Sequence, residues 1–400
     1  RGLPLTFRSI FWPLLGERIY GWPGHLIDLV TVFATLFGLS TSLGLGVSQV
    51  ATGMGYVSGN TLGIINGNIL PQIAGIPLAE VLLIAGITGI ATLSVAAGLD
   101  GGVKRLSTLN LYIMFALLAF MIIVGPTIFI FGTLADGLAS YFNNFLGLAF
   151  FTGAISSAQS VGGYTVGGWM GSWTIFYWSW WIAWSPFVGM FIARISKGRT
   201  VREFMTGVLL LPTLFSFLWL STFGGSALWV ELVGGGGIAS AVANQGQTVA
   251  MFAMLAQFPL GAVSGIVATL LVITFFVTSS DSGSLVVDHL TSGGKHDVPK
   301  IQRIFWALTE GLVAAILLIG GGLTALQTAS VSTGLPFAVI LLLMCYTVYL
   351  GLDNEYQILE SEEFAERIED LTEAEDVDVI TAGDEMVTDI TEGDESASGD

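Results

Sequence analysis

The stretch Trp173-Thr-Ile-Phe-Tyr-Trp-Ser-Trp-Trp-Ile-Ala-Trp-Ser-Pro-Phe-Val-Gly-Met-Phe-Ile-Ala193 contains no charged residue, and four basic residues follow it, at 194, 197, 199 and 202. An α-helix needs about 20 apolar residues to cross roughly 30 Å of bilayer hydrocarbon. Basic residues collect in loops on the cytoplasmic side of a membrane. The stretch therefore predicts a transmembrane helix whose C-terminal end faces the cytoplasm.

Long apolar runs of this kind recur along the first 352 residues. Hydrophobic residues make up 53% of the chain and charged residues 11%, whereas ordinary soluble proteins have about 25% charged residues. A soluble bundle of this size would need a charged outer surface that these residues do not supply. We therefore predict an all-α multi-pass membrane protein with eight transmembrane helices, over residues 26–50, 78–97, 107–133, 173–195, 204–228, 259–284, 304–327 and 332–352.

The basic residues lie in alternate loops of this arrangement. Every Lys and Arg of the first 352 residues lies before the first span, between the second and third, near the end of the fourth, or after the sixth. The other loops, at 51–77, 134–172, 229–258 and 328–331, contain none. This sorting predicts a cell-membrane protein with both termini on the cytoplasmic side. Apolar segments inside two of the base-free loops are expected either to lie flat in the membrane interface or to cap a cavity; they are 137–151 and 247–258.

The net charge of −17 comes from the C-terminal end of the chain. Residues 353–400 hold 19 of the 30 acidic side chains and a single basic one. The first part, residues 355–371, is expected to form a short amphipathic helix, and the acidic run beyond residue 373 lacks aromatic residues and is predicted to be disordered. We interpret residues 353–400 as a hydrated cytoplasmic tail, of a kind that suits the salt-rich cytoplasm of a halophile.

The chain lacks the motifs of nucleotide-driven or metal-dependent chemistry. The segment Gly293-Gly-Lys-His296 has the wrong spacing for a phosphate-binding loop and no following Ser or Thr. Its one cysteine, Cys345, excludes a disulfide framework and a cysteine metal cluster. We therefore expect a protein that is not an enzyme, has no resident cofactor and does not bind nucleic acid.

Tryptophans are concentrated in the fourth span, where six of the chain's eleven fall between residues 169 and 184. An aromatic belt at the membrane boundary explains Trp169 and Trp173, but Trp180, Trp181 and Trp184 lie about two to three turns deeper. Indole faces there suit a cation that cannot be hydrogen-bonded, such as a quaternary ammonium, through contacts of about 0.5–2 kcal/mol each. The pattern leaves a cation-binding aromatic box and ordinary aromatic packing as open alternatives.

A polar cluster lies late in the sixth span, over Thr278–Ser284. Its first two hydroxyls favour an alkali cation, which prefers oxygen ligands, whereas hydrogen bonding between packed helices is the alternative. For Asp281 we expect a structural role near the cytoplasmic end. Glu310, in the seventh span, lies about two turns from Arg303 and is expected to pair with it.

With these stretches placed, the chain resembles the betaine/choline/carnitine transporter family. The resemblance covers residues 1 to about 352 and rests on Arg1-Gly-Leu-Pro-Leu5, Gly16–Trp22, Phe37–Gly46, Trp180-Trp-Ile-Ala-Trp-Ser-Pro-Phe187, Gly198–Phe204 and Thr278–Ser284. It implies a twelve-span protein whose last ten spans form two inverted five-span repeats. It also implies that this chain begins just after the fourth span, so that we expect a partial 5+5 inverted-repeat, sodium-symporter-like fold that lacks roughly the first four spans.

The resemblance implies roles for individual residues. Positions that match binding of the trimethylammonium group are Trp180, Trp181, Trp184 and Phe187. Positions that match the second repeat's share of a sodium site are Phe275, Thr278 and Ser279. The family's homotrimers imply a homotrimer here.

A second sodium site is implied only in part. Thr35 and Phe187 match two of its positions. Four residues after Thr35, however, sodium-coupled members have Thr where this chain has Leu39. The departure puts the second ion, and with it the stoichiometry, in question.

We therefore expect a secondary transporter that takes up a quaternary-ammonium osmolyte across the lipid bilayer, with glycine betaine as the first candidate and choline or carnitine next. Sodium is the expected coupling ion. A sodium-independent exchanger or a proton-coupled carrier of the same family is one alternative, and a truncated chain that is inactive alone is another. The retained Thr278 and Ser279 favour sodium coupling, and Leu39 favours the exchanger.

Overall fold

The structure is a computed structural model, and it describes residues 3–59, 72–73, 76–97, 103–161, 164–295, 298–361, 365–366, 377–382 and 385–390. The long helices are α2 (Trp22–Val57), α3 (Leu78–Ala97), α4 (Val103–Val124), α5 (Thr127–Ala149), α7 (Tyr177–Ile195), α8 (Val201–Leu232), α11 (Gly261–Thr291) and α12 (Lys300–Leu359). The shorter ones are the 3₁₀ helices η1 (Phe7–Phe11), η2 (Gly16–Tyr20) and η4 (Gln247–Val249), the π-helical η3 (Met170–Phe176), and α1 (Trp12–Leu15), α6 (Val166–Trp169), α9 (Ile238–Gln245) and α10 (Ala250–Leu255). The described residues also form three short antiparallel strand pairs: β1 (Gln72–Ile73) with β2 (Ile76–Pro77), β3 (Ser160–Val161) with β4 (Tyr164–Thr165), and β5 (Val377–Ala382) with β6 (Glu385–Ile390).

Six of the described helices are long and apolar enough to cross a membrane: α2, α3, α4, α8, α11 and α12. This confirms the prediction of an all-α multi-pass membrane protein. Helix α12 has 60 residues, which at 1.5 Å per residue is about 90 Å, far more than one bilayer. Its backbone leaves the helical conformation at Gly321 and Gly322, and Gly322 has a φ of 65°, which only glycine adopts freely. Helix α12 is therefore two helices in sequence. They overlap the seventh and eighth predicted spans, but the break lies inside the predicted seventh span, 304–327, rather than between the two spans. The total of eight spans stays a prediction.

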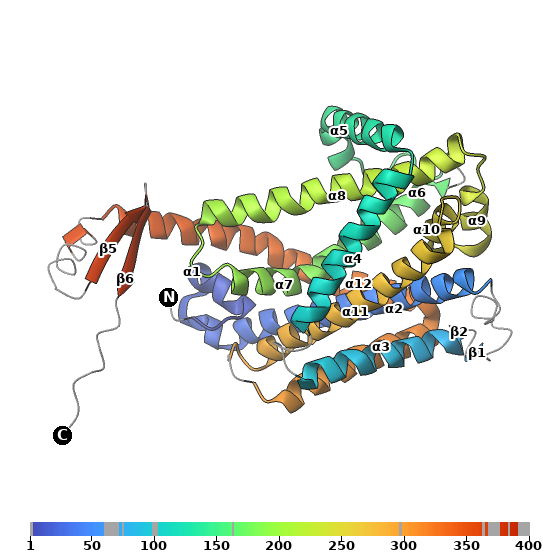
Figure 1. Ribbon diagram of the computed structural model, residues 1–400. Coiled ribbons are helices and arrows are strands. Elements are labelled where there is room, and N and C mark those ends of the chain that lie inside the picture. Colours follow the sequence, from blue (N-terminus) through green and yellow to red (C-terminus); the bar gives the residue numbers. More distant parts are fainter. Residues whose placement is uncertain are drawn as a thin grey trace, which may run out of the picture.

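The third predicted span, residues 107–133, is divided in the structure. Helix α4 ends at Val124, and α5 begins at Thr127. Between them lies Pro126, which has no N–H to donate and whose ring clashes with the preceding turn, so that a straight helix ends before it. The apolar composition continues through this break, which is why the prediction ran too far. Helix α5 turns away from the direction of α4 (Figure 1) and contains most of the apolar segment expected in the base-free loop.

Helix α2 lies at the centre of the bundle and packs against α12, α11 and α7 (Figure 1). Its middle, residues 34–46, is rich in glycine and hydroxyl side chains and is almost entirely buried. Small residues of this kind let helix backbones approach closely in membranes. One close approach to α11 is at Gly283, where a Cβ atom would lie 2.5 Å from a terminal methyl group of Leu39. Helix α2 thereby sets the positions of α7 and α11 relative to each other.

The basic and base-free loops lie at opposite ends of α2. At one end, the basic loop between α11 and α12 packs on the N-terminal segment, with Gly294 against the backbone of Leu5. At the other end, the side chain of Gln49 donates a hydrogen bond of 3.1 Å to the carbonyl oxygen of Thr248, in the base-free loop before α11. The separation agrees with the predicted sorting of charge, and the orientation of the termini in the membrane stays a prediction. The second apolar loop segment, 247–258, forms η4 and α10 over this end of α2.

Two strands, β5 and β6, pair within the acidic tail, where the sequence predicts mostly disorder. The two segments are rich in the β-branched residues Val, Ile and Thr, which favour strands. The register places Val377 opposite Ile390 and Val379 opposite Thr388. Most of the remaining tail lies outside the described residues, so its disorder stays a prediction. Of the predicted amphipathic helix, residues 355–371, the structure describes only 355–361 and 365–366. Residues 355–359 are helical there, as the end of α12.

Candidate functional site

The tryptophan-rich stretch forms α7, and the π-helical turn η3 leads into it. Pro186 lies inside α7 and cannot donate an N–H to the carbonyl group of Ile182, four residues earlier. The hydroxyl group of Ser185 donates to that carbonyl oxygen instead, at 2.7 Å. The helix therefore continues across the proline, and the aromatic residues on both sides of it share one continuous surface.

Two of the predicted tryptophans point their N–H groups at the same two oxygens of α2. The indole Nε1 of Trp180 lies 3.0 Å from the hydroxyl oxygen of Ser42 and 3.3 Å from the carbonyl oxygen of Gly38. The indole Nε1 of Trp184 lies 2.6 Å and 3.1 Å from the same two atoms. The Ser42 hydroxyl in turn donates to the Gly38 carbonyl oxygen at 3.0 Å. Four polar contacts to one turn of α2 thus hold both rings in defined orientations.

The ring planes of these two tryptophans have different neighbours. Phe176 stacks on Trp180, with centroids 5.9 Å apart and planes 6° from parallel. Phe187 meets Trp184 edge to face at 5.1 Å and 78°. Both tryptophans are half-buried. The structure therefore brings three of the four predicted substrate residues, Trp180, Trp184 and Phe187, onto the face of α7 that meets α2.

Trp181 lies apart from this face. Its side chain is 55% exposed, and the ring contact that the structure describes for it is with Tyr177, at 6.3 Å. Successive residues on a helix point about 100° apart, so Trp180 and Trp181 cannot both face α2. The four predicted residues are therefore divided between a face packed on α2 and an exposed face.

The predicted sodium residues lie together on α11. The hydroxyl group of Thr278 donates within its own helix, to the carbonyl oxygens of Phe275 at 3.0 Å and Thr274 at 3.1 Å. Ser279 is half-buried, and the Phe275 side chain is 40% exposed. The hydroxyl oxygens of Thr278 and Ser279 and the carbonyl oxygen of Phe275 are hard ligands that suit an alkali cation.

Asn110 of α4 is a neighbour that the sequence analysis missed. Its amide nitrogen lies 3.3 Å from the hydroxyl oxygen of Thr278. The side chain is 2% exposed, and its amide oxygen has no hydrogen-bond partner. An amide about one turn inside the start of an apolar span was the available signal, because polar residues within such spans are costly and commonly functional.

The residues of the implied second sodium site lie along α2 and α7. The hydroxyl group of Thr35 is buried and donates to the carbonyl oxygen of Thr31 at 2.8 Å. Phe187 packs against the cluster that contains Ala34. Leu39, which replaces the expected threonine, is 3% exposed and fills the space beside Gly283. An apolar group thus occupies the place where a ligand oxygen was expected.

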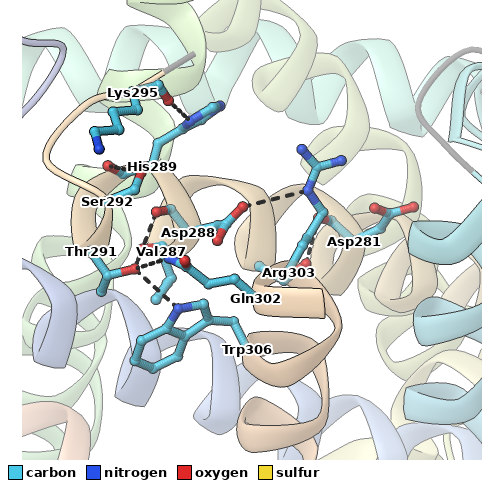
Figure 2. A network of polar contacts seen from close by, with 11 residues as sticks. Asp281, Val287, Asp288, His289, Thr291, Ser292, Lys295, Gln302, Arg303 and Trp306 are labelled. Carbon is cyan, nitrogen blue, oxygen red and sulfur yellow. Dashed lines mark hydrogen bonds and ion pairs between the residues drawn. The ribbon is translucent and has the colours of Figure 1, made fainter. Parts of the chain in front are cut away.

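A network of polar contacts joins the end of α11 to the start of α12 (Figure 2). The fully buried carboxylate of Asp288 lies 3.8 Å from the guanidinium nitrogen Nε of Arg303. Asp281 accepts a hydrogen bond of 2.6 Å from Ser94 of α3. Arg303 was expected to pair with Glu310 on its own helix; the described ion pair joins it to Asp288 instead. The structural role expected for Asp281 stays a prediction, and its contact with Ser94 supports it.

A cavity of about 500 Å³ lies between residues 3–10, α7 and α12. Its lining is almost entirely apolar and includes Met190 and Met344 but none of the tryptophans of α7. Among the residues that the structure describes, no three His, Cys, Asp or Glu side chains are grouped so as to hold a metal ion. The cavity lies apart from both the aromatic and the hydroxyl clusters, because its lining includes neither the tryptophans of α7 nor Thr278 and Ser279.

Comparison with known families matches residues 1–357 to the family described as "BCCT, betaine/carnitine/choline family transporter". The chain belongs to this family. Its members are transporters, which confirms the expectation that the protein is not an enzyme. The aromatic helix α7 and the hydroxyl cluster of α11 both lie within the matched residues.

Several relatives have names that specify substrates. A glycine betaine/proline/choline transporter of Vibrio parahaemolyticus is 46% identical over 360 residues, which cover 89% of this chain and 60% of the relative. Glycine betaine transporter 1 of the same organism is 45% identical over 89% of this chain and 64% of its own. A probable glycine betaine transporter of Desulfitobacterium hafniense is 43% identical over 89% and 67%. This chain thus spans about three-fifths of the length of the first of these BCCT relatives.

Proposed function

We propose that the intact BCCT protein containing this chain is a secondary transporter that takes up a quaternary-ammonium osmolyte, with glycine betaine as the first substrate to test and choline or carnitine next. The names of the relatives support osmolyte uptake. The observation that carries the proposal is the pair of indoles, Trp180 and Trp184, whose N–H groups are held by the same oxygens of α2.

A quaternary ammonium offers no hydrogen to a protein acceptor, so its recognition depends on aromatic faces. Holding an indole by its N–H fixes the direction of its face before the cation arrives, and preorganisation of this kind lowers the entropic cost of binding. Phe176 stacks beside Trp180 and stiffens that ring further. The arrangement suits a compact trimethylammonium group better than a substrate that must be bound through hydrogen bonds.

We further propose sodium as the coupling ion, bound near Thr278, Ser279 and the carbonyl oxygen of Phe275. The unpartnered amide oxygen of Asn110 supports this, because its amide nitrogen already contacts Thr278. A buried polar oxygen without a partner costs about 1–3 kcal/mol, and a cation next to the cluster would remove that cost. Ion binding that favours the closed arrangement would then raise the affinity for the osmolyte.

The test is uptake of labelled glycine betaine by proteoliposomes that contain the intact transporter, with and without an inward sodium gradient. We expect uptake to require the gradient, and the double substitution Thr278→Ala with Ser279→Ala to abolish that requirement or the uptake itself. Thr274→Ala, one turn away on α11, is the matched control and should keep sodium dependence. Sodium dependence that survives the double substitution places the ion elsewhere, and wild-type protein that carries no betaine under any gradient refutes the substrate.

Sodium-independent exchange is a second candidate, and Leu39 favours it. This side chain fills the place of an expected ion ligand and is packed against Gly283. Counterflow of betaine or carnitine in proteoliposomes without any sodium gradient would support exchange. In either case we propose that both termini face the cytoplasm. We also propose that the protein forms a homotrimer, and cross-linking in membranes can test this oligomeric state.

A further inference from the structure

Glu310 is a carboxylic side chain buried inside the helix bundle. It lies on the first half of α12 and is 3% exposed. Seven residues separate it from Arg303, which corresponds to about 10 Å along the helix, towards the bilayer interior. In the part of the chain that the structure describes, Arg303 lies within ion-pair distance of Asp288 rather than of Glu310.

The contacts of Glu310 are made with uncharged groups. The hydroxyl group of Ser280 on α11 donates to its carboxyl oxygen Oε2 at 3.1 Å. The hydroxyl group of Ser40 on α2 donates to its backbone carbonyl oxygen at 3.2 Å. Within the part of the chain that the structure describes, the ion pairs join Asp28 to Arg8 and Asp288 to Arg303, and none includes Glu310.

The parts of α2, α3 and α11 that lie nearest Glu310, residues 29–55, 78–97 and 261–288, contain no basic residue. Between residues 29 and 55, α2 has no titratable side chain, and α3 carries only Glu80. On α11 the titratable groups nearest in sequence to Ser280 are Asp281 and Asp288, which are themselves acidic. Arg303, on α12, lies within ion-pair distance of Asp288. The charged groups that face this region therefore oppose a negative charge on Glu310 or are already paired.

An ionised carboxylate in such a place is costly. Transfer of an isolated charge into an apolar interior is opposed by a large loss of hydration, and a single hydroxyl contact offsets little of it. The neutral acid avoids this cost and can still share a hydrogen bond with Ser280. The position also adjoins α2 at Ser40, the residue after Leu39, where the implied second ion would have lacked a ligand.

We propose that Glu310 is a proton-binding site of this transporter, with the carboxyl group protonated when α2, α11 and α12 are packed as in the structure. On release, the O–H bond of the carboxyl group breaks and water accepts the proton, which requires the interface with Ser280 to open. The site does not depend on the proposed substrate. Only a role for this proton in transport rests on the proposed function.

Infrared difference spectroscopy of the intact transporter at neutral pH tests the proposal directly. A protonated carboxyl group has a carbonyl stretching band that is well separated from the bands of carboxylates. We expect Glu310→Gln to remove one such band and Ser280→Ala to shift it, because the substitution removes a hydrogen-bond partner. Glu203→Gln, at an exposed helix start, is the matched control and should leave the band intact. If Glu310→Gln leaves the protonated-carboxyl band unchanged and removes carboxylate bands instead, Glu310 is ionised and the proposal is overturned.

The pH dependence of stability gives a second measurement that needs no transport activity. An exposed glutamate is ionised at neutral pH, so the folded protein would bind one more proton than the unfolded protein, and stability falls as pH rises. We expect the melting temperature of the wild-type protein to fall more steeply between neutral and alkaline pH than that of Glu310→Gln. Equal slopes would contradict a proton on Glu310. Proteoliposomes that show no betaine uptake would instead count against the proposed function and leave both of these readouts unaffected.

Discussion

Replacing Ser42 by alanine removes a hydroxyl oxygen that both Trp180 and Trp184 use as an acceptor. The carbonyl oxygen of Gly38 stays within 3.3 Å and 3.1 Å of the two indole nitrogens, so neither N–H loses every partner. The loss is therefore that of a neutral hydrogen bond, about 1 kcal/mol, rather than that of two orphaned donors. Since 1.4 kcal/mol is a tenfold change in affinity, the half-saturation constant for betaine should rise about fivefold.

The assay is initial uptake of betaine by proteoliposomes over a range of concentrations at saturating sodium. Because Ser42 acts through the indoles, we expect a higher half-saturation constant, an unchanged maximal rate per transporter, and a shift of tryptophan emission that reflects altered ring surroundings. Ser42→Thr keeps the hydroxyl group and should restore both properties. The Trp184→Phe protein has no N–H at this position for Ser42 to accept from. Ser42→Ala should therefore raise the half-saturation constant less in that protein than in the wild type.

Three outcomes would refute the reasoning. A Ser42→Ala protein with wild-type half-saturation and emission would show that the contacts with α2 do not orient the indoles for binding. An equal loss for Ser42→Ala and Ser42→Thr would show that Ser42 acts through its size rather than its hydroxyl group. If the effects of Ser42→Ala and Trp184→Phe on the half-saturation constant simply add, Ser42 does not act through the Trp184 indole.

Two further predictions test the other face of α7 and the contact between α2 and α11. Trp181→Leu should raise the half-saturation constant for betaine about tenfold, or about 1.4 kcal/mol, if its exposed ring is part of the cation pathway; Trp178→Leu, 61% exposed on the same helix, is the control, and equal effects would assign both rings to the membrane interface. Gly283→Ala should lower the free energy of unfolding by about 1–3 kcal/mol, because the new methyl group would lie 2.5 Å from Leu39. In thermal melts, the double variant with Gly283→Ala and Leu39→Ala should lose less stability than the sum of the losses of the two single variants. Losses that simply add would show that the two residues do not compete for space.

Hydropathy predicted most of the helices because a membrane requires every long crossing segment to be apolar. It failed at Pro126, where the apolar run continues although the helix does not. The break at Gly321 and Gly322 was invisible to hydropathy for a related reason, since glycine is compatible with both a helix and a bend. The positions of helices are thus easier to predict than their ends.

The candidate site was predictable by residue type but not by orientation. Helical spacing is compatible with one face that holds Trp181 and Trp184 and with another that holds Trp180, Trp184 and Phe187. Only the packing of α7 on α2 shows that the second face turns inward. Glu310 and Arg303 looked like partners because they share a helix. Arg303 contacts Asp288 on α11 instead, and contacts between helices cannot be derived from spacing along one of them.

One turn of α2 contacts α7 and α11 at the same time, so a movement of one of these helices can displace the other. Gly38 and Ser42 hold the indoles of α7, while Leu39, between them in sequence, is wedged beside Gly283 of α11. A sliding of α11 that moves Gly283 would push Leu39 and so displace the oxygens that aim the tryptophans. The hydroxyls proposed for the ion lie little more than one turn along α11 from Gly283. Ion binding on α11 and osmolyte binding on α7 would therefore be coupled through a part of α2 no longer than one helical turn.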